Sequence, residues 1–131
     1  MLAIFACVHN AARSQMAAAF FNALAAPGRA RALSAGTDPG PRVLPEVVEA
    51  MREAGLDLSA ARPQKLTLEL AAGATLLVTM GCGEACPALP GVRRLDWPLP
   101  DPQGQTLERV RVLRDAIRAR VEALLAAEDL A

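Results

Sequence analysis

The chain has 131 residues, enough for one ordinary domain and too few for two, so we expect residues 1–131 to form a single domain. Hydrophobic residues make up 53% of it, which indicates a folded globular protein. Lysine plus arginine equals aspartate plus glutamate, at 14 each, so the chain lacks the basic excess that favours nucleic acids or membrane surfaces. No apolar run approaches the roughly 20 residues that span a bilayer.

The first ten residues, MLAIFACVHN, are apolar but lack the basic region and the cleavage site of a signal peptide. We therefore expect a cytoplasmic protein, in a compartment that keeps thiols reduced. The cysteines, Cys7, Cys82 and Cys86, are too few for a structural disulfide framework. They are compatible with inert core thiols, with a metal site, or with redox and nucleophilic chemistry.

The first half of the chain alternates strand and helix patterns. Residues 2–8 form a continuous apolar run, as in a strand covered on both faces. Residues 14–26 carry apolar side chains at helical spacing, and a Pro-Gly pair ends that pattern. Residues 30–37 are predicted to form a second strand, and a proline-rich loop follows. Residues 45–55 form a predicted helix with proline in its first turn and glycine at its end.

The second half continues this alternation. Residues 64–70 alternate apolar and polar side chains, which is compatible with a strand or with a short helix. Residues 74–81 give the clearest buried strand, and residues 93–99 are predicted to form the last one. Residues 106–127 form a long amphipathic helix in which Thr106 is the predicted N-cap.

This order of elements predicts an α/β fold with a mainly parallel sheet. In such folds, ligands bind beyond the carboxyl ends of the strands. Two segments that contain cysteines leave predicted strands in this way: CVHNAARS at residues 7–14 and GCGEAC at residues 81–86. Both cysteine groups should therefore lie at the same edge of the sheet.

The segment CVHNAARS has the features of an oxyanion site. A short loop from a strand into a helix turns its backbone N–H groups inward and forms an anion-binding nest at the helix N-terminus. Arg13 at the far end of this loop can bind two oxyanion oxygens in bidentate fashion. The same positive field favours the thiolate form of Cys7, which would make it a nucleophile. The alternative is that Cys7 is a small buried hydrophobic residue.

Individual loop residues suit this interpretation. Ser14 could donate a hydrogen bond to the Cys7 thiolate, and Asn10 tolerates the left-handed backbone that a tight circular loop needs. His9 is the only histidine, and it is either a catalytic base or a residue that acts through its backbone. The predicted oxyanion-binding residues are Val8, His9, Asn10, Ala11, Ala12, Arg13 and Ser14.

CVHNAARSQMA resembles the phosphate-binding loop of the low-molecular-weight tyrosine phosphatase superfamily, and within it the chain is most similar to the arsenate reductases. LSAGT, VTMGCGEACP, DWPLPDPQG and the final helix are also similar to that family, in the same order, so the resemblance covers essentially the whole chain. It implies a four-stranded parallel sheet flanked by helices.

Arsenate and phosphate are alike in shape and charge, so the first loop does not distinguish reduction from hydrolysis. A reductase must supply two electrons, and a pair of thiols supplies them by becoming a disulfide. By this resemblance, Cys7 attacks arsenate, Cys82 attacks the sulfur of Cys7 and releases arsenite, and Cys86 then attacks Cys82. The alternatives are a low-molecular-weight tyrosine phosphatase that works through a phosphocysteine at Cys7, or a non-enzymatic oxyanion or redox sensor.

Asp101 resembles the family's Asp-Pro general acid, which would protonate the leaving hydroxide. The other interpretation of Asp101 is an ordinary turn aspartate before proline. Tyrosine phosphatases usually place an aromatic residue after this Asp-Pro pair, whereas here Gln103 follows and the chain has no tyrosine. This departure weakens the phosphatase interpretation. Asp96 and Trp97 are predicted to be packing and strand-end residues.

The resemblance implies thioredoxin as the electron donor and no bound cofactor. Because the later cysteines are closer in sequence than in some relatives, a small thiol such as mycothiol or glutathione is the alternative reductant. A metal site is not expected, since only Cys7 and His9 remain to complete four ligands around the cysteine pair. Some relatives bind potassium through an aspartate and a threonine, but residues 58–66 offer neither, and Lys65 could fill that space.

Overall fold

Strands and helices alternate along the part of the chain that the computed structural model describes, residues 1–82 and 86–131. The four strands form one sheet in the order β2-β1-β3-β4, and every neighbouring pair is parallel. The predicted α/β fold with a four-stranded parallel sheet is confirmed. In chain order the elements are β1 (Leu2–Cys7), α1 (Arg13–Leu24), β2 (Arg31–Gly36), α2 (Pro45–Glu53), β3 (Leu76–Thr79), β4 (Arg93–Asp96) and α3 (Leu107–Ala127).

The central strand β1 is buried along its whole length because its sequence, LAIFAC, is apolar on both faces. Its register places Ile4 between Leu33 of β2 and Leu77 of β3. Side chains of successive residues point to opposite faces of a strand, so Phe5 and Cys7 belong to one hydrophobic cluster while Ile4 belongs to another. The strand therefore separates two cores.

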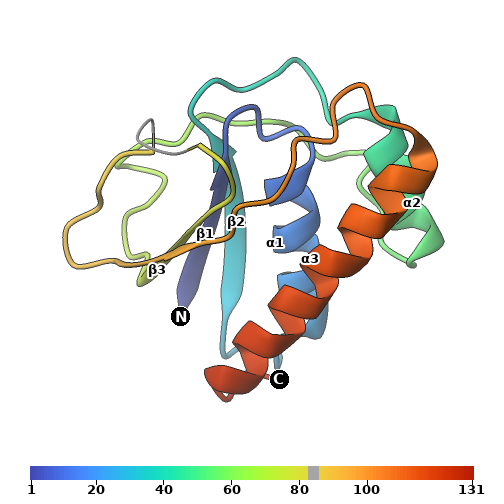
Figure 1. Cartoon of the computed structure of the whole chain (residues 1–131). Helices are drawn as coiled ribbons and strands as arrows, with labels where there is room; N and C mark the ends of the chain where they lie inside the picture. The colour runs from blue at the N-terminus through green and yellow to red at the C-terminus, as the bar shows by residue number, and fades with distance from the viewer. Residues whose placement is uncertain (83–85) are drawn as a thin grey trace.

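The two sides of the sheet are covered differently. Figure 1 shows α1, α2 and α3 gathered on one side, which we call the helix face. The other side, which we call the loop face, packs against connecting segments instead. The larger cluster, on the helix face, includes Phe20 and Phe21 of α1 and Ile117 of α3. The loop-face cluster includes Leu66 and Leu89, which lie outside the strands and helices.

α1 is apolar around most of its circumference, and eight of its residues are buried. Phe21 makes an edge-on contact with Phe5 at a ring-centroid separation of 5.8 Å. Trp97, just after β4, packs against the same Phe5 ring at 5.7 Å, and Thr79 donates a hydrogen bond to the Asp96 carboxylate. The predicted packing and strand-end roles of Asp96 and Trp97 are confirmed.

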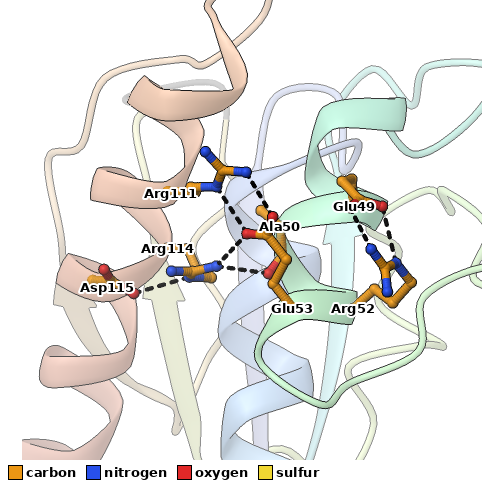
Figure 2. Close-up of polar contacts among 7 residues, drawn as sticks. All are labelled: Glu49, Ala50, Arg52, Glu53, Arg111, Arg114 and Asp115. Carbon is orange, nitrogen blue, oxygen red and sulfur yellow. Dashed lines mark hydrogen bonds and ion pairs between the residues drawn. The ribbon is translucent and has the colours of Figure 1, made fainter.

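α3 begins as predicted, because the Thr106 hydroxyl accepts a hydrogen bond from the Arg109 N–H at 3.2 Å. Figure 2 shows how α3 is fastened to α2 at the surface: Arg111 donates to the Glu53 carboxylate through Nε and Nη2, at 2.8 and 2.7 Å. Arg114 donates to the same carboxylate at 3.2 Å. Within the described residues, neither α3 nor any other helix has the length and apolar character needed to cross a membrane.

Several predicted boundaries were too wide. The predicted strands at residues 74–81 and 93–99 are four-residue strands, and the predicted helix at residues 14–26 ends at Leu24. Residues 64–70 form neither a regular strand nor a helix: Lys65 makes one isolated parallel bridge with Gly36, and turns follow. The bridge joins this segment to the carboxyl end of β2.

Candidate active site

The segment from Cys7 to Arg13 curls back on itself because its carbonyl groups are all bonded outward. The carbonyls of Cys7, Val8 and His9 accept hydrogen bonds from Thr37, Asp38 and Gly40 at 3.2, 2.8 and 2.9 Å. Those of Ala11 and Ala12 accept from Leu44 and Met16 at 2.9 and 3.0 Å. Because a peptide's N–H and C=O groups point in opposite directions, carbonyls bonded to other segments leave the N–H groups of the same peptides available to an anion inside the loop. This arrangement is compatible with the predicted nest, and its binding of an oxyanion stays a prediction.

Asn10 holds the centre of the loop. Its φ of 50° lies in the left-handed region, as predicted for an asparagine in a tight turn. Its side chain is fully buried, and Nδ2 donates to the Ser14 hydroxyl at 2.7 Å. Its Oδ1 accepts from the Gln64 N–H at 2.9 Å and from Gln15 Nε2 at 3.2 Å.

Ser14 connects this network to the cysteine. Its Oγ lies 2.9 Å from Cys7 Sγ, in the contact that the sequence predicts. Because Ser14 already accepts a hydrogen bond from Asn10, its own hydroxyl hydrogen is available to Cys7. Cys7 is a free, buried cysteine at the carboxyl end of β1, directly before this loop.

Arg13 is 5% exposed, and the nitrogens of its guanidinium group differ in their contacts. Nη1 donates to the carbonyl oxygens of Met80 and Leu99 at 2.6 and 3.1 Å. Nε is buried without a hydrogen-bond partner among the described residues. Nη2 lies 4.0 Å from the Asp101 carboxylate. The Nε and Nη2 edge has the fork geometry that can bind two oxyanion oxygens, and its buried Nε is a donor that still lacks an acceptor among the described residues.

Asp101 lines the same small cavity as Cys7 and Arg13, so it lies at the same edge of the sheet as the loop. Its Oδ1 accepts a hydrogen bond from the Gln103 N–H at 3.0 Å, and its side chain is 47% exposed. One cavity therefore joins a thiol, a guanidinium group and a carboxyl group on the helix face of the sheet. Its lining consists of Cys7, His9, Ala11, Ala12, Arg13, Leu44, Asp101 and Gln103.

The family model for low molecular weight phosphotyrosine protein phosphatases matches residues 3–130. The chain belongs to this family. A relative in Halobacterium salinarum with a provisional arsenate reductase name is 40% identical over 125 residues, which are 89% of this chain and 85% of that one. The glutaredoxin arsenate reductase of Synechocystis is 34% identical over 126 residues, which are 94% of this chain and 95% of that one.

Among solved structures, the thioredoxin-dependent arsenate reductase of Corynebacterium glutamicum matches with a TM-score of 0.81 and 33% identity. The match covers 96% of this chain and 60% of that one, so this chain spans about three fifths of the length of the Corynebacterium protein.

In this member of the phosphatase family, the second cysteine group lies on the loop face. Cys82 and Cys86 are joined by a disulfide, with their Cα atoms 5.6 Å apart. Their short spacing in sequence is therefore compatible with a bond between them. The sulfur of Cys82 lies 3.9 Å from the carbonyl oxygen of Ala6, the residue before Cys7, so the cysteine groups meet at one edge of the sheet as predicted. Both bonded cysteines are buried.

Two glycines that shape the site were not recognised from the sequence as contacts of the loop. A Cβ at Gly36 would lie 2.5 Å from the Val8 carbonyl oxygen, so only glycine lets β2 end against the loop. A Cβ at Gly81 would collide with Nη1 of Arg13, and its φ is +100°. Gly81 therefore leaves room for the Arg13 guanidinium group beside the end of β3.

His9 and Lys65 both bond to the segment after β2. His9 Nδ1 is 3.1 Å from the Asp38 carbonyl oxygen, which can only accept, so Nδ1 carries the hydrogen. Lys65 Nζ donates to the Thr37 carbonyl at 2.8 Å. Each side chain thus ties residues 37–38 to a neighbouring segment. This placement favours a positioning role for His9.

Proposed function

We propose that this protein is an arsenate reductase that uses Cys7, Cys82 and Cys86 in sequence and receives its electrons from thioredoxin. The observation that carries the proposal is the combination of a free Cys7 in an oxyanion loop with a Cys82–Cys86 disulfide at the same edge of the sheet. A phosphatase needs the first feature only, whereas a two-electron reductase needs both. The names of the relatives above support this choice.

The first step is nucleophilic attack by the Cys7 thiolate on arsenic(V). A sulfur–arsenic bond forms, an arsenic–oxygen bond breaks, and the departing hydroxide takes a proton from Asp101 and leaves as water. The Arg13 edge formed by the unpaired Nε and by Nη2, which lies 4.0 Å from the Asp101 carboxylate, holds the remaining oxygens together with the loop N–H groups. The proton donor is within reach, because Asp101 lines the same cavity as Cys7.

The second step is the reduction itself. The Cys82 thiolate attacks Sγ of Cys7, a Cys7–Cys82 disulfide forms, and the electron pair of the sulfur–arsenic bond stays on arsenic, which departs as arsenite. The Cys86 thiolate then attacks the Cys82 sulfur, and Cys7 leaves as a thiolate ready for the next arsenate. The resulting Cys82–Cys86 disulfide is the bond found in the structure. A dithiol protein of the thioredoxin type reduces it and completes the cycle.

Hydrolysis of phosphate esters uses the same first step with phosphorus in place of arsenic, and water then breaks the sulfur–phosphorus bond. This hydrolysis requires no thiol other than Cys7, so the Cys82–Cys86 pair would have no role in it. The residue after the Asp101-Pro102 pair is Gln103, which offers no aromatic ring to bind a tyrosine side chain. Phosphatase activity is therefore expected to be residual.

The test is arsenate-dependent oxidation of NADPH with thioredoxin and thioredoxin reductase supplied, measured beside the hydrolysis of an aryl phosphate by the same sample. We expect steady oxidation that requires arsenate. Brisk hydrolysis without oxidation would make the protein a phosphatase. If neither occurs, glutathione with glutaredoxin and then mycothiol are supplied in place of thioredoxin, and silence with every donor would indicate a non-enzymatic sensor.

A further inference from the structure

One carbonyl group of the loop from Cys7 to Arg13 is held differently from the others. The other carbonyls from Cys7 to Ala12 accept hydrogen bonds from main-chain N–H groups. The carbonyl of Asn10 accepts from a side chain instead, because Nε2 of Gln15 donates to it at 3.1 Å. Main-chain donors are present in every residue except proline, so the contact from Gln15 is the one that depends on the identity of a side chain.

The Gln15 side chain is itself held in place. It lies in the first turn of α1 and is 7% exposed. Its Nε2 also lies 3.2 Å from the Asn10 side-chain oxygen and 3.2 Å from the Arg62 carbonyl, so its two hydrogens are shared among three acceptors. Two positions after Arg62, the Gln64 carbonyl accepts from the Gly36 N–H at 2.9 Å, at the end of β2. The Gln15 amide therefore joins α1, the loop and the segment beside the end of β2.

The peptide that Gln15 holds consists of the Asn10 carbonyl and the Ala11 N–H, and Ala11 lines the cavity over Cys7. Since the two groups of a peptide point in opposite directions, a donor on the carbonyl keeps the Ala11 N–H available to an anion inside the loop. The φ of Asn10 is 50°, and a left-handed backbone persists only where its surroundings hold it. Without the amide, the buried carbonyl loses its donor, and rotation of the peptide would turn an oxygen toward the anion.

We propose that Gln15 is a positioning residue for oxyanion binding, whose amide holds the peptide between Asn10 and Ala11 so that the Ala11 N–H is presented to the bound oxyanion. Gln15 is not among the residues that line the cavity, so it acts through the loop. The inference rests on the proposed function, because it concerns the oxyanion of the same site. It requires only that the loop bind a tetrahedral oxyanion, whether arsenate or phosphate.

The first test measures the affinity of wild type and of Gln15→Met for inorganic phosphate by isothermal titration calorimetry. Methionine is close to glutamine in length but donates no hydrogen bond. The dissociation constant should rise about tenfold, because the anion loses one well-placed N–H donor. Calorimetry also gives the number of sites per chain. Loss of folded protein alone would reduce that number and leave the dissociation constant unchanged, and this result would overturn the inference.

The second test observes the Ala11 N–H directly. In a proton–nitrogen NMR spectrum of wild type, the resonance of the Ala11 amide should move downfield when phosphate is added, because the N–H group donates to an anion. In Gln15→Met the same resonance should move much less. A full shift of the Ala11 resonance in Gln15→Met would show that the peptide keeps its orientation without the amide, and it would overturn the inference.

Asn22→Leu is the matched control. Asn22 also lies in α1, and its amide also donates to a main-chain carbonyl, that of Ala32 in β2, at 3.0 Å. This variant should bind phosphate as wild type does. An equal loss of affinity in Asn22→Leu, or a wild type that binds no phosphate, would overturn the inference even where arsenate reduction is observed. Conversely, a protein without arsenate reduction whose phosphate affinity depends on Gln15 would fail the proposed function and retain the inference.

Discussion

The two faces of the sheet divide the proposed chemistry between them. On the helix face, Cys7 belongs to the large core and is surrounded by a loop whose every carbonyl from Cys7 to Ala12 is bonded. On the loop face, Cys82 and Cys86 belong to a smaller core covered by connecting segments. A nucleophile that must meet an oxyanion in one geometry benefits from rigid surroundings. A disulfide that must form and be reduced benefits from a cover that opens at low cost.

The largest effect should come from the helix face. Cys7→Ser removes the thiolate that both arsenate reduction and phosphate ester hydrolysis require, so both rates should fall by about 10⁴-fold or more. The measurement is the pair of assays described above. Retention of either activity at more than a small fraction of the wild-type rate would exclude Cys7 as the nucleophile.

The next effects should come from the loop face and should differ in kind. Cys82→Ser should stop arsenate turnover and leave residual ester hydrolysis in place, because it removes only the attacking thiol of the second step. Cys86→Ser should release one arsenite per protein molecule and then stop, because the Cys7–Cys82 bond can form but cannot be passed on. Arsenite release in a single turnover, beside ester hydrolysis, distinguishes them. Equal loss in all three cysteine variants would contradict the relay.

Gly81 lies where the two faces meet. Gly81→Ala should reduce kcat/KM for arsenate by about 100-fold, since its Cβ collides with Nη1 of Arg13 and small displacements of a binding group cost this much. Gly73→Ala is the matched control: its φ of +83° is also left-handed, but its Cβ would have no neighbour within 4 Å. The control should lose stability, by about 1–3 kcal/mol, and keep its activity. Similar activity in both variants would show that Gly81 does not control the position of Arg13.

The two hydrophobic cores can be compared by making the same change, leucine to alanine, in each of them. Leu125→Ala on the helix face should lower the free energy of unfolding by about 4 kcal/mol, because α3 and the sheet hold the cavity open around a residue that is 1% exposed. Leu89→Ala on the loop face should cost about 2 kcal/mol, since the connecting segments around it can collapse into the space. Urea denaturation measures both. An equal decrease in the free energy of unfolding would indicate that the helices on one face and the connecting segments on the other are equally rigid.

The sequence predicted what depends on local patterns. The apolar run of β1, the N-cap at Thr106 and the left-handed Asn10 follow from residue types and their spacing, and all three are confirmed. The strand-end position of Cys7 and the contact with Ser14 followed from the topology of a parallel sheet.

What escaped prediction depends on contacts between distant segments. Gln64 donates to Asn10 across 54 positions, and Arg13 donates to Leu99 across 86. Which side of the sheet lacks helices could not be predicted either, because the ambiguous residues 64–70 were compatible with a helix there. In the structure this segment forms no helix, and Lys65 makes a single parallel bridge with Gly36 instead.

The smallest effect concerns the surface of the helix face, where Figure 2 shows Arg111 and Arg114 around Glu53. Hydrogen bonds from Arg111, with a further contribution from Arg114, lower the pKa of Glu53 from 4.5 to about 2. Because the folded state has the lower pKa, this contribution to stability is fully present above pH 4.5 and is lost as the pH falls through about 2.

The difference in urea midpoint between wild type and Glu53→Gln should therefore be modest at neutral pH, since the group is exposed and screened by solvent, and should shrink between pH 4.5 and 2. Glu69→Gln, an exposed substitution on the loop face, serves as the control and should show no such trend. A difference in urea midpoint that stays constant between pH 4.5 and 2 would show that Glu53 stabilises the α2–α3 contact by packing rather than by charge. The rigidity of the helix face would then come from its hydrophobic core alone.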